Sequence, residues 1–349
     1  MSTSSMSTSA TFLYVGNAQT RDVSAFRLDE KNGDLASIGT FAVPGPAAPC
    51  FSFPLAVSPD KRFLFAVLRN EPWSVRSFAI DAASGRLDYL GSGPLADNTC
   101  YISTDMTGRF LLSASYQGSK VAVNPIGGDG IVRPPQQIID TELKSHSILV
   151  DAANRHALSA CLGGDLFYQW RFDAESGRLT PNEPPFVPVK KHSGPRHFVF
   201  HPNGRLVYLL NEHAVTIHVY DYDPDKGTLA EKQVVNALTA TPGDKIWATD
   251  IHITPDGSFL YAAERGSSTL AMLKVDPGLG TLSLIGHIVT EKQPRGFAID
   301  RTGRFLYCTG QLSTRMSSYA IDGTSGNLTK LGDYPVGGNP NWIEIVSLP

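Results

Sequence analysis

The stretch Phe198-Val-Phe-His-Pro-Asn-Gly-Arg-Leu-Val-Tyr208 has the pattern of two short apolar strands joined by a polar turn. The same pattern recurs in stretches that begin at Leu55, Ile102, Ile148, Ile251 and Phe297, so that successive copies start 46 to 53 residues apart. A period of this length, built from short strands, is typical of one blade of a β-propeller. The repeat therefore predicts one all-β ring, rather than the several domains that the length alone would suggest.

A seventh copy is split between the two ends of the chain. Its first strand is Trp342-Ile-Glu-Ile-Val-Ser-Leu348, and its second strand is Thr11-Phe-Leu-Tyr-Val-Gly16. We therefore predict a seven-bladed β-propeller with four antiparallel strands in each blade, closed where residues 11–17 pair with residues 342–348. Residues 1–10 are expected to form a disordered tail, and residues 11–349 a single domain.

Six of the blades repeat a turn of the form Asp-x-x-x-Gly-x-Leu between the third and fourth strands, at residues 29–35, 81–87, 173–179, 223–229, 276–282 and 322–328. The remaining blade carries Gly127-Gly-Asp-Gly130 instead. In antiparallel blades, the turns between strands 1–2 and 3–4 share one face, whereas the 2–3 loops and 4–1 crossovers share the other. The second face holds the variable, polar loops, so we expect function there.

The composition excludes several classes of partner. A formal net charge of −3 gives no general attraction to nucleic acid, and no apolar run reaches the roughly 20 residues of a membrane span. The four cysteines show no CxxC pair, which is typical of reduced structural thiols. Residues 1–9 lack the basic start and apolar core of a secretory signal. We expect a cytoplasmic protein that is a monomer or weak homodimer.

Two sets of equivalent positions are expected to meet at one mouth of the central channel. The first set, which we call the channel ring, stands just ahead of each first strand and comprises Phe53, Cys100, His146, Arg196, Thr249, Arg295 and Pro340. The second set, the loop ring, follows each second strand and comprises Ala18, Arg69, Tyr116, Leu162, Glu212, Arg265 and Gln311. Four arginines, one histidine and one glutamate therefore converge from distant parts of the chain.

Such a cluster of guanidinium groups indicates a bound anion, because like charges repel unless a counter-charge joins them. Arginine also suits carboxylate or phosphate because its donors form a planar fork. Asp250 and His252 flank the same strand and are either partners of the site residues or satisfied polar groups of the core. No His and carboxylate cluster stands at metal-ligand spacing, and no nucleotide or hydrolase-elbow motif occurs. We expect no metal and no other cofactor.

Several motifs of the chain resemble one family of propellers. They are Val57-Ser-Pro-Asp-Lys-Arg62, Gly194-Pro-Arg-His-Phe-Val-Phe-His-Pro-Asn203, Asn211-Glu212, Trp247-Ala-Thr-Asp-Ile-His-Ile-Thr-Pro-Asp-Gly257, Gln293-Pro-Arg-Gly-Phe297 and Gly337-Gly-Asn-Pro-Asn-Trp342. The chain resembles, from about residue 11 onward, the propeller-type bacterial 6-phosphogluconolactonase family. That family also includes the fungal 3-carboxy-cis,cis-muconate lactonizing enzyme.

The resemblance implies a lactonase that hydrolyses 6-phospho-D-glucono-1,5-lactone in the pentose phosphate pathway. The family's proposed catalytic set of one His, two Arg and one Glu falls by motif on His146, Arg196, Arg265 and Glu212. Arg196 and Arg265 would stabilise the oxyanion, and either His146 or Glu212 would be the base. The residues expected to bind the small anionic sugar lactone are Arg295, Arg69, Lys144, His197, Tyr116, Asp250, His252 and Gln311.

Three alternatives to this hydrolysis stay open at the level of the sequence. Another aldonolactone (neutral, sulfonated or differently phosphorylated) could use the same mouth, or the reaction could run as a lactonizing cycloisomerisation. A non-enzymatic propeller scaffold is the third alternative. Against it, the chain does not repeat from blade to blade the Gly-His and Trp-Asp dipeptides that recur in scaffolds of the WD type.

Overall fold

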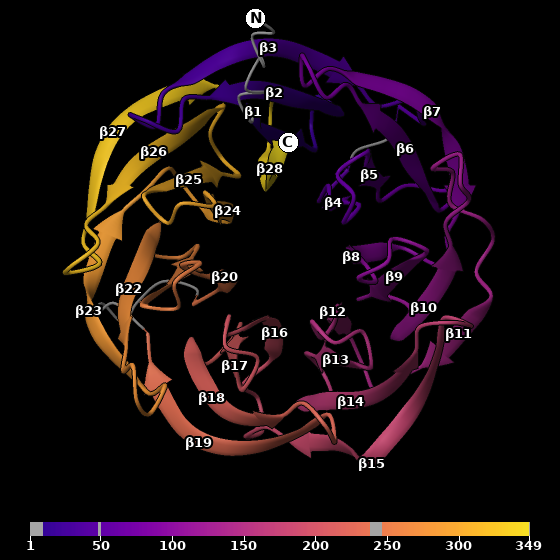
Figure 1. Ribbon diagram of the computed structural model, residues 1–349, viewed down its shortest axis with the longest axis vertical. Helices are drawn as coiled ribbons and strands as arrows, with labels where there is room; N and C mark the ends of the chain where they lie inside the picture. Colours follow the sequence, from indigo (N-terminus) through magenta and orange to yellow (C-terminus); the bar gives the residue numbers. More distant parts are fainter. Residues whose placement is uncertain (1–9, 48–49, 238–245, 349) are drawn as a thin grey trace, which may run out of the picture.

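The computed structural model describes residues 10–47, 50–237 and 246–348, and these residues form seven sheets of four antiparallel strands each. The sheets are arranged radially around one axis, as the blades of a propeller (Figure 1). The predicted seven-bladed, all-β fold is confirmed. None of the described residues forms a helix with the length and apolarity that a membrane crossing requires.

The strands are numbered along the chain, and each blade runs from an inner first strand to an outer fourth strand. The first strands are β28 (Pro340–Leu348), β4 (Leu55–Val57), β8 (Thr99–Thr104), β12 (Ser145–Val150), β16 (Pro195–Phe200), β20 (Ala248–Ile253) and β24 (Pro294–Ile299). The second strands are β1 (Ala10–Asn17), β5 (Phe63–Leu68), β9 (Phe110–Ser115), β13 (His156–Cys161), β17 (Leu206–Asn211), β21 (Phe259–Glu264) and β25 (Phe305–Gly310).

The outer half of each blade follows the same order. The third strands are β2 (Asp22–Leu28), β6 (Ser74–Ile80), β10 (Lys120–Pro125), β14 (Leu166–Asp173), β18 (Thr216–Asp223), β22 (Thr269–Val275) and β26 (Arg315–Ile321). The fourth strands are β3 (Leu35–Ala42), β7 (Leu87–Pro94), β11 (Gln137–Asp140), β15 (Arg178–Pro188), β19 (Thr228–Asn236), β23 (Leu282–Val289) and β27 (Leu328–Pro335).

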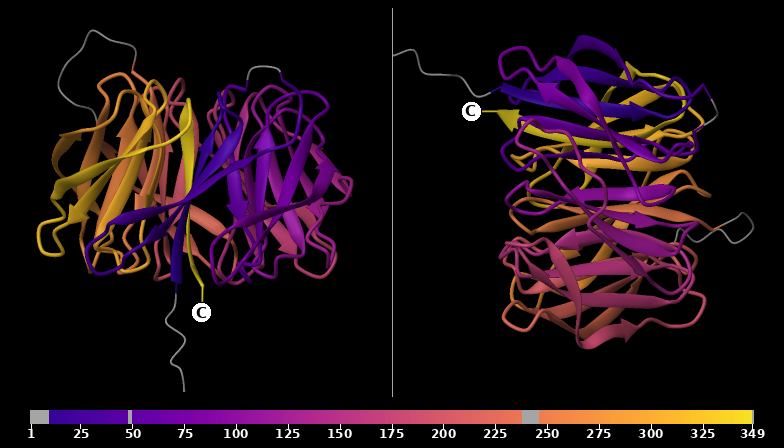
Figure 2. Two further views of the ribbon diagram at one scale, coloured as in Figure 1. Left: turned by 90° about the horizontal axis from the view of Figure 1, so that it is seen from above. Right: turned by 90° about the vertical axis from the view of Figure 1, so that its right-hand side faces the viewer.

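The two ends of the chain close the ring in one blade, whose strand order is β28-β1-β2-β3. Thr11 pairs with Ser347 and Val15 with Ile343, as the split repeat predicts. The C-terminal end of β28 lies on one face of the disc (Figure 2). Of the predicted tail, residues 1–9 lie outside the described residues, whereas Ala10 already belongs to β1.

The second strands are buried along nearly their whole length because each is covered on both faces by neighbouring blades. Their apolar, β-branched and aromatic side chains suit this position. Tyrosines of these strands also connect the blades through their hydroxyl groups. Those of Tyr14, Tyr208, Tyr261 and Tyr307 donate to turn carbonyls of the next blade, at Gly85, Gly280, Gly326 and Gly33.

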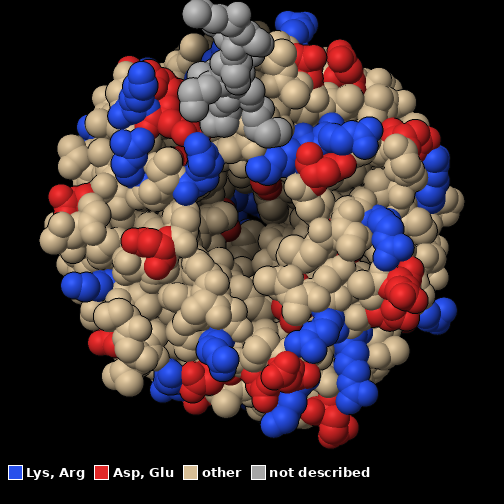
Figure 3. Space-filling model, in the orientation of Figure 1, with Lys and Arg blue, Asp and Glu red and all other residues tan. Residues whose placement is uncertain are grey.

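The Asp-x-x-x-Gly-x-Leu segments form the predicted turns between third and fourth strands. In one of them the Gly227 N–H donates to the Asp223 carbonyl over 2.7 Å, and Gly227 has a φ of 67° that a residue with a side chain adopts less readily. The blade with Gly127-Gly-Asp-Gly130 has only the four-residue β11 as its fourth strand. These turns lie on the face where β28 ends. Figure 3 shows that face, which is hollowed at its centre and carries both charge signs around its rim.

Ring closure by β28 predicts a strong effect of mutations in this strand on the whole molecule. Ile343→Ala, in a buried position opposite Val15, should lower the free energy of unfolding by about 2–5 kcal/mol. Val289→Ala, at a site that is 73% exposed on the outer strand β23, should change it by less than about 0.5 kcal/mol. Urea unfolding measures both. Equal effects would contradict the role of β28, as would cooperative unfolding of a chain that lacks residues 342–349.

Candidate functional site

The backbone turns one side chain of most first strands out of the ladder and into the channel. The pairing register shifts between Thr99 and Tyr101, Ser145 and Ser147, Pro195 and His197, and Pro294 and Gly296. The bulged residues are therefore Cys100, His146, Arg196 and Arg295, all members of the channel ring. A bulge of this kind redirects a side chain. In three of these strands, a residue with positive φ (Lys144, Gly194 and Gln293) stands two positions earlier and bends the chain into the bulge.

One member of the predicted channel ring is wrong. In β28, Gly16 pairs with Trp342 and Asn17 with Pro340, so the bulged residue is Asn341 and not Pro340. The Asn341 carboxamide oxygen accepts a hydrogen bond from the Phe53 N–H over 2.9 Å, which joins two neighbours of the ring. The alignment began this copy at Trp342, but the residue two positions after the bulge, where Phe198 stands in β16, is Ile343.

A buried carboxylate joins the channel ring to the loop ring. Glu212 directly follows β17, and its Oε2 accepts a hydrogen bond from Arg196 Nε over 2.7 Å and lies 3.6 Å from an Arg265 amino group. Its Oε1 accepts from Trp247 Nε1 over 2.9 Å. Burial by itself raises the pKa of Glu212, but the guanidinium groups of Arg196 and Arg265 outweigh burial and hold that pKa below its usual range. The carboxylate is therefore ionised.

Four guanidinium groups surround this carboxylate at two levels of exposure. Arg196 and Arg265 are buried, and Arg196 also donates to the Thr249 carbonyl, whereas Arg265 donates to Gln311 Oε1 over 3.3 Å. Arg69 and Arg295 are partly exposed. Burial, and then the charge of Arg196, lower the pKa of Arg295 to about 9. The same two causes, in the same order, lower the pKa of Arg265. This excess of positive charge suits the mouth to an anion.

His146 lies among these cations as a neutral imidazole. Its ring is buried and contacts the rings of Tyr116 and His197, with centroids 5.8 Å and 5.2 Å away. Burial, followed by the charge of Arg196, holds the pKa of His146 well below 6.5. Its Nδ1 is buried and has no hydrogen-bond partner among the described residues. As a neutral imidazole, His146 can accept a proton.

The mouth opens sideways into a groove between two blades. A cavity of about 540 Å³ there is lined by Phe51, Arg69, Asn70, Glu71, Trp73, Asn98, Tyr116 and Gln117. Arg69 is held on its wall by Asn98, whose Oδ1 accepts from Arg69 Nε over 2.7 Å. Lys144 lies over the ring of Tyr116, with its ammonium 5.4 Å from the ring centroid. The groove therefore combines aromatic walls with cations, and this combination suits a polar substrate with an acidic group.

His197, Asp250 and His252 belong to a separate layer, farther along the inner strands toward the face where β28 ends. The Asp250 carboxylate contacts His197 Nδ1 at 2.9 Å and His252 Nε2 at 3.2 Å. Asp250 and His252 also line a cavity of about 220 Å³ together with Tyr101, Trp342 and Glu344. The structure thus brings His146, Arg69, Arg196, Glu212, Arg265, Arg295, Lys144, Tyr116 and Gln311 to the mouth, and it places His252 away from the arginines.

Sequence reasoning missed two residues that shape the site. Trp247 holds Glu212, and its ring lies 3.3 Å below the guanidinium carbon of Arg265. Glu344 accepts from Trp342 Nε1 over 2.9 Å at the other end of the channel. Trp247 stands one residue before β20, which is a position the repeat could have singled out. No sequence signal marked Glu344, because a charge on an inner strand can face either the channel or the next blade.

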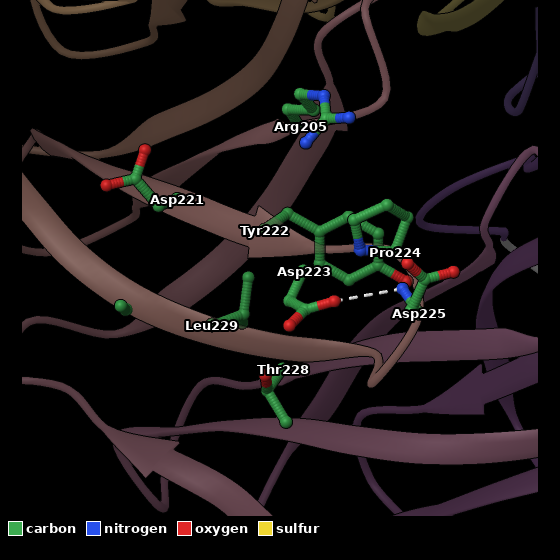
Figure 4. Close-up of a pocket in the computed structure, with 9 residues that line it drawn as sticks. Arg205, Asp221, Tyr222, Asp223, Pro224, Asp225, Thr228 and Leu229 are labelled. Atoms are coloured by element: carbon green, nitrogen blue, oxygen red, sulfur yellow. Dashed lines mark hydrogen bonds between the residues drawn. The ribbon is translucent and has the colours of Figure 1, made fainter.

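A further pocket lies outside the channel, at the turn between β18 and β19. It has a volume of about 610 Å³ and is lined by Arg205, Asp221, Tyr222, Asp223, Pro224, Asp225, Thr228, Leu229 and Ala230 (Figure 4). Asp223 is engaged in the turn, where it accepts the Asp225 N–H over 3.0 Å. Three carboxylates and one guanidinium make this pocket unsuitable for an anion. Within the described ranges, no three His, Cys, Asp or Glu side chains gather in a way that could hold a metal ion.

The comparisons with known proteins agree with this fold. The family described as "Lactonase, 7-bladed beta-propeller" matches residues 49–345. The chain belongs to this family of lactone-hydrolysing enzymes. It is 38% identical to the 6-phosphogluconolactonase of Pectobacterium carotovorum over 96% of this chain and 98% of the relative, and 37% identical to that of Serratia proteamaculans over 96% and 98%.

Solved structures lead to the same family. A periplasmic gluconolactonase of Pseudomonas aeruginosa superimposes with a TM-score of 0.89 at 28% identity, covering 97% of this chain and all of that one. A putative 6-phosphogluconolactonase of Bacteroides fragilis has a TM-score of 0.88 at 27% identity, covering 99% of this chain and 100% of that one. The protein is therefore a carboxylic-ester hydrolase that opens sugar lactones, as its sequence predicted.

Glu344 gives the channel a testable dependence on pH. Burial raises the pKa of Glu344 to about 7, so the folded protein holds this proton more tightly than the unfolded chain. Its contribution to stability is complete below the unfolded pKa, near 4.5, and is lost as the pH rises through about 7. Glu344→Gln should therefore gain stability relative to the original protein as the pH rises from 5 to 8. Urea unfolding across this range checks it, and a constant difference would refute the buried proton.

Proposed function

We propose that this lactonase hydrolyses a phosphorylated aldonolactone, 6-phospho-D-glucono-1,5-lactone, to 6-phospho-D-gluconate. The observation that carries the proposal is the gathering of four guanidinium groups and a neutral histidine at the mouth of the channel. A neutral lactone ring has no charge to balance so many cations, whereas a phosphate carries two. The names of the bacterial relatives support the same substrate.

His146 is the general base in this proposal. Water must lose a proton as it attacks the lactone carbonyl, and the unprotonated imidazole of His146 is free to receive it. Glu212 is less suited to this role, because both of its oxygens already accept hydrogen bonds from Arg196 and Trp247. We therefore assign Glu212 to holding the arginines in place. The protonated His146 then returns the proton to the ring oxygen as the carbonyl carbon–oxygen bond breaks.

Arg265 and Arg196 would stabilise the negative charge that develops on the carbonyl oxygen. Both are buried and fixed by Glu212, so their donors are oriented before the substrate arrives, which is the condition for effective oxyanion stabilisation. The Arg265 Nε is a buried donor with no partner among the described residues. It is available to an oxyanion.

The partly exposed cations would bind the phosphate. Arg69, Arg295 and Lys144 stand at the open side of the mouth and next to the aromatic groove. Binding at this distance from the reacting carbonyl acts equally on substrate and transition state, so it affects KM more than kcat. We further propose that the enzyme acts in the cytoplasm, without a cofactor, as a monomer or weak homodimer.

A second candidate substrate is an aldonolactone without the phosphate. The periplasmic gluconolactonase of Pseudomonas aeruginosa, whose structure is similar over 97% of this chain, favours it. The same oxyanion and base groups would serve both substrates, and only the use of Arg69, Arg295 and Lys144 differs. A substrate panel with and without the 6-phosphate separates the two candidates.

Binding of the phosphate by Arg295 predicts a change in KM for the phosphorylated lactone only. Arg295→Ala should raise KM for 6-phosphogluconolactone roughly 10- to 100-fold, as expected for the loss of one or two charge-assisted hydrogen bonds, and leave kcat nearly unchanged. Hydrolysis of the unphosphorylated lactone should hardly change. Continuous titration of the released acid measures both. Arg62→Ala, at an exposed arginine outside both rings, is the matched control. Equal losses on both lactones would refute phosphate binding by Arg295.

The assignment of the base predicts a change in the pH profile. His146→Gln should lower kcat roughly 10²- to 10⁴-fold and abolish the ascending limb, because that limb reports deprotonation of the base. Glu212→Gln should lower kcat but keep the limb. His287→Gln, on the outer strand β23, serves as the control. A limb that disappears only in the Glu212 variant would transfer the role of base to Glu212.

A further inference from the structure

His197 and Asp250 form a second buried histidine–carboxylate pair directly beside the candidate base. His197 follows Arg196 on β16, and its Nδ1 lies 2.9 Å from Asp250 Oδ1 on the adjacent inner strand β20. Tyr101 and Trp342 pack edge-on against the His197 ring, with centroids 5.1 Å and 6.0 Å away. The ring is thereby fixed from three sides.

The surroundings of Asp250 determine which nitrogen of His197 carries the proton. Asp250 accepts the N–H of Ile251 over 3.1 Å and that of Phe297 over 3.4 Å, and it also contacts His252. Burial acts to raise the pKa of Asp250, but His252 and His197 lower it well below its usual range. An ionised carboxylate only accepts hydrogen bonds, so Nδ1 of His197 is the donor. Nε2 of His197 therefore keeps its lone pair.

That lone pair and the candidate base lie together. The rings of His146 and His197 are in edge contact, with centroids 5.2 Å apart. Nε2 of His197 and Nδ1 of His146 are both buried, and neither has a hydrogen-bond partner among the described residues. A general base is normally oriented by a third group, and no carboxylate is hydrogen-bonded to His146 within the described part of the chain. His197 is the neighbour with an acceptor to offer.

We propose that the Asp250–His197 pair positions His146, holding its ring while it is neutral and stabilising its imidazolium during the reaction. The proposal rests on the proposed function, in which His146 takes the proton of the attacking water. The carbonyl carbon gains the water oxygen and loses the ring oxygen. His146 then gives its proton to that ring oxygen. Asp250 and His197 exchange no atoms with the substrate, so both are positioning residues.

The charges around His146 explain why such a pair is needed. Arg196 comes from β16, Arg295 from β24 and Arg69 from the loop after β5, and all three disfavour the imidazolium. A charged His197 would disfavour it too, but burial lowers the pKa of His197 to about 4 and keeps that ring neutral. Lys144 and Tyr116 face the same region from the neighbouring loops. The negative charge of Asp250, relayed through His197, opposes these cations on the side away from the mouth. Removal of that charge should make His146 harder to protonate.

The test compares Asp250→Asn with the original enzyme, since Asn keeps the size and an acceptor oxygen but removes the charge. We expect kcat to fall roughly 10- to 100-fold, less than on loss of the base itself, with KM nearly unchanged. The ascending limb of the pH profile should move to lower pH. An NMR titration of the His146 imidazole should show the same shift without any substrate.

His197→Phe keeps an aromatic ring but has no nitrogen, so its kcat should fall as much as that of Asp250→Asn. His197→Gln supplies an acceptor again, so its kcat should lie between that of His197→Phe and that of the original enzyme. The matched control is Glu231→Gln, which removes the carboxylate 2.7 Å from another buried histidine, His218, outside both rings. It should leave kcat and the limb unchanged. Thermal unfolding identifies the variants that keep the fold. If another variant does not fold, the comparison is made with His197→Gln.

Three results would overturn the proposal. One is a kcat of His197→Phe or Asp250→Asn equal to that of the original enzyme. Another is a fall in kcat without a shift in the His146 titration, which would make the pair merely structural. The third is a comparable loss in Glu231→Gln. If the original enzyme hydrolyses none of the phosphorylated lactones, the proposed function fails, but the His146 titration still decides the role of the pair.

Discussion

The pairing of β28 with β1 closes the ring, and closure forces seven first strands to run side by side around one axis. Each first strand is the inner edge of its own four-stranded sheet, and the closed ring holds that edge at a fixed angle to the channel. Side chains from distant parts of the chain then meet at the mouth of the channel. Arg69 and Arg295, which are far apart in the sequence, become neighbours in this way.

Ring closure brings arginines that repel one another together, and the negative charge of Glu212 offsets part of that repulsion. A buried guanidinium without a partner is strongly disfavoured, and Glu212 contacts two of them. The Thr249 carbonyl accepts a further hydrogen bond from Arg196, and the ring of Trp247 packs against Arg265. The compensation is incomplete, since burial and the other arginines still lower the pKa of Arg265. The remaining positive charge is what an anionic substrate, and above all its oxyanion, can neutralise. This uncompensated positive charge lowers the stability of the site. In the proposed function, it is also the charge that stabilises the oxyanion.

The sequence predicted the fold and the members of the mouth because both depend on equivalence between repeats. Periodicity marks where each first strand begins and each second strand ends, and Arg196, Glu212 and Arg265 stand at those positions. It placed the ring member of β28 one residue early, since Trp342 and Ile343 are both apolar and either could begin the copy. It also left open the role of Asp250, because only coordinates show that His197 and His252 share its carboxylate.

The charged residues of the channel consequently lie in successive layers along its axis. The partly exposed Arg69 and Arg295 at the rim have hydrogen-bond partners outside the buried triad of Arg196, Glu212 and Arg265. These partners are Asn98 for Arg69 and the Phe51 carbonyl for Arg295. In the proposed function, a lactone with a different acidic or neutral substituent would need different residues at the rim. Its carbonyl would still meet Arg196 and Arg265. In the function and the pair proposed above, the Asp250 carboxylate supplies negative charge on the side of His146 away from the mouth. Substrate choice and proton transfer would then be controlled by different layers of one ring.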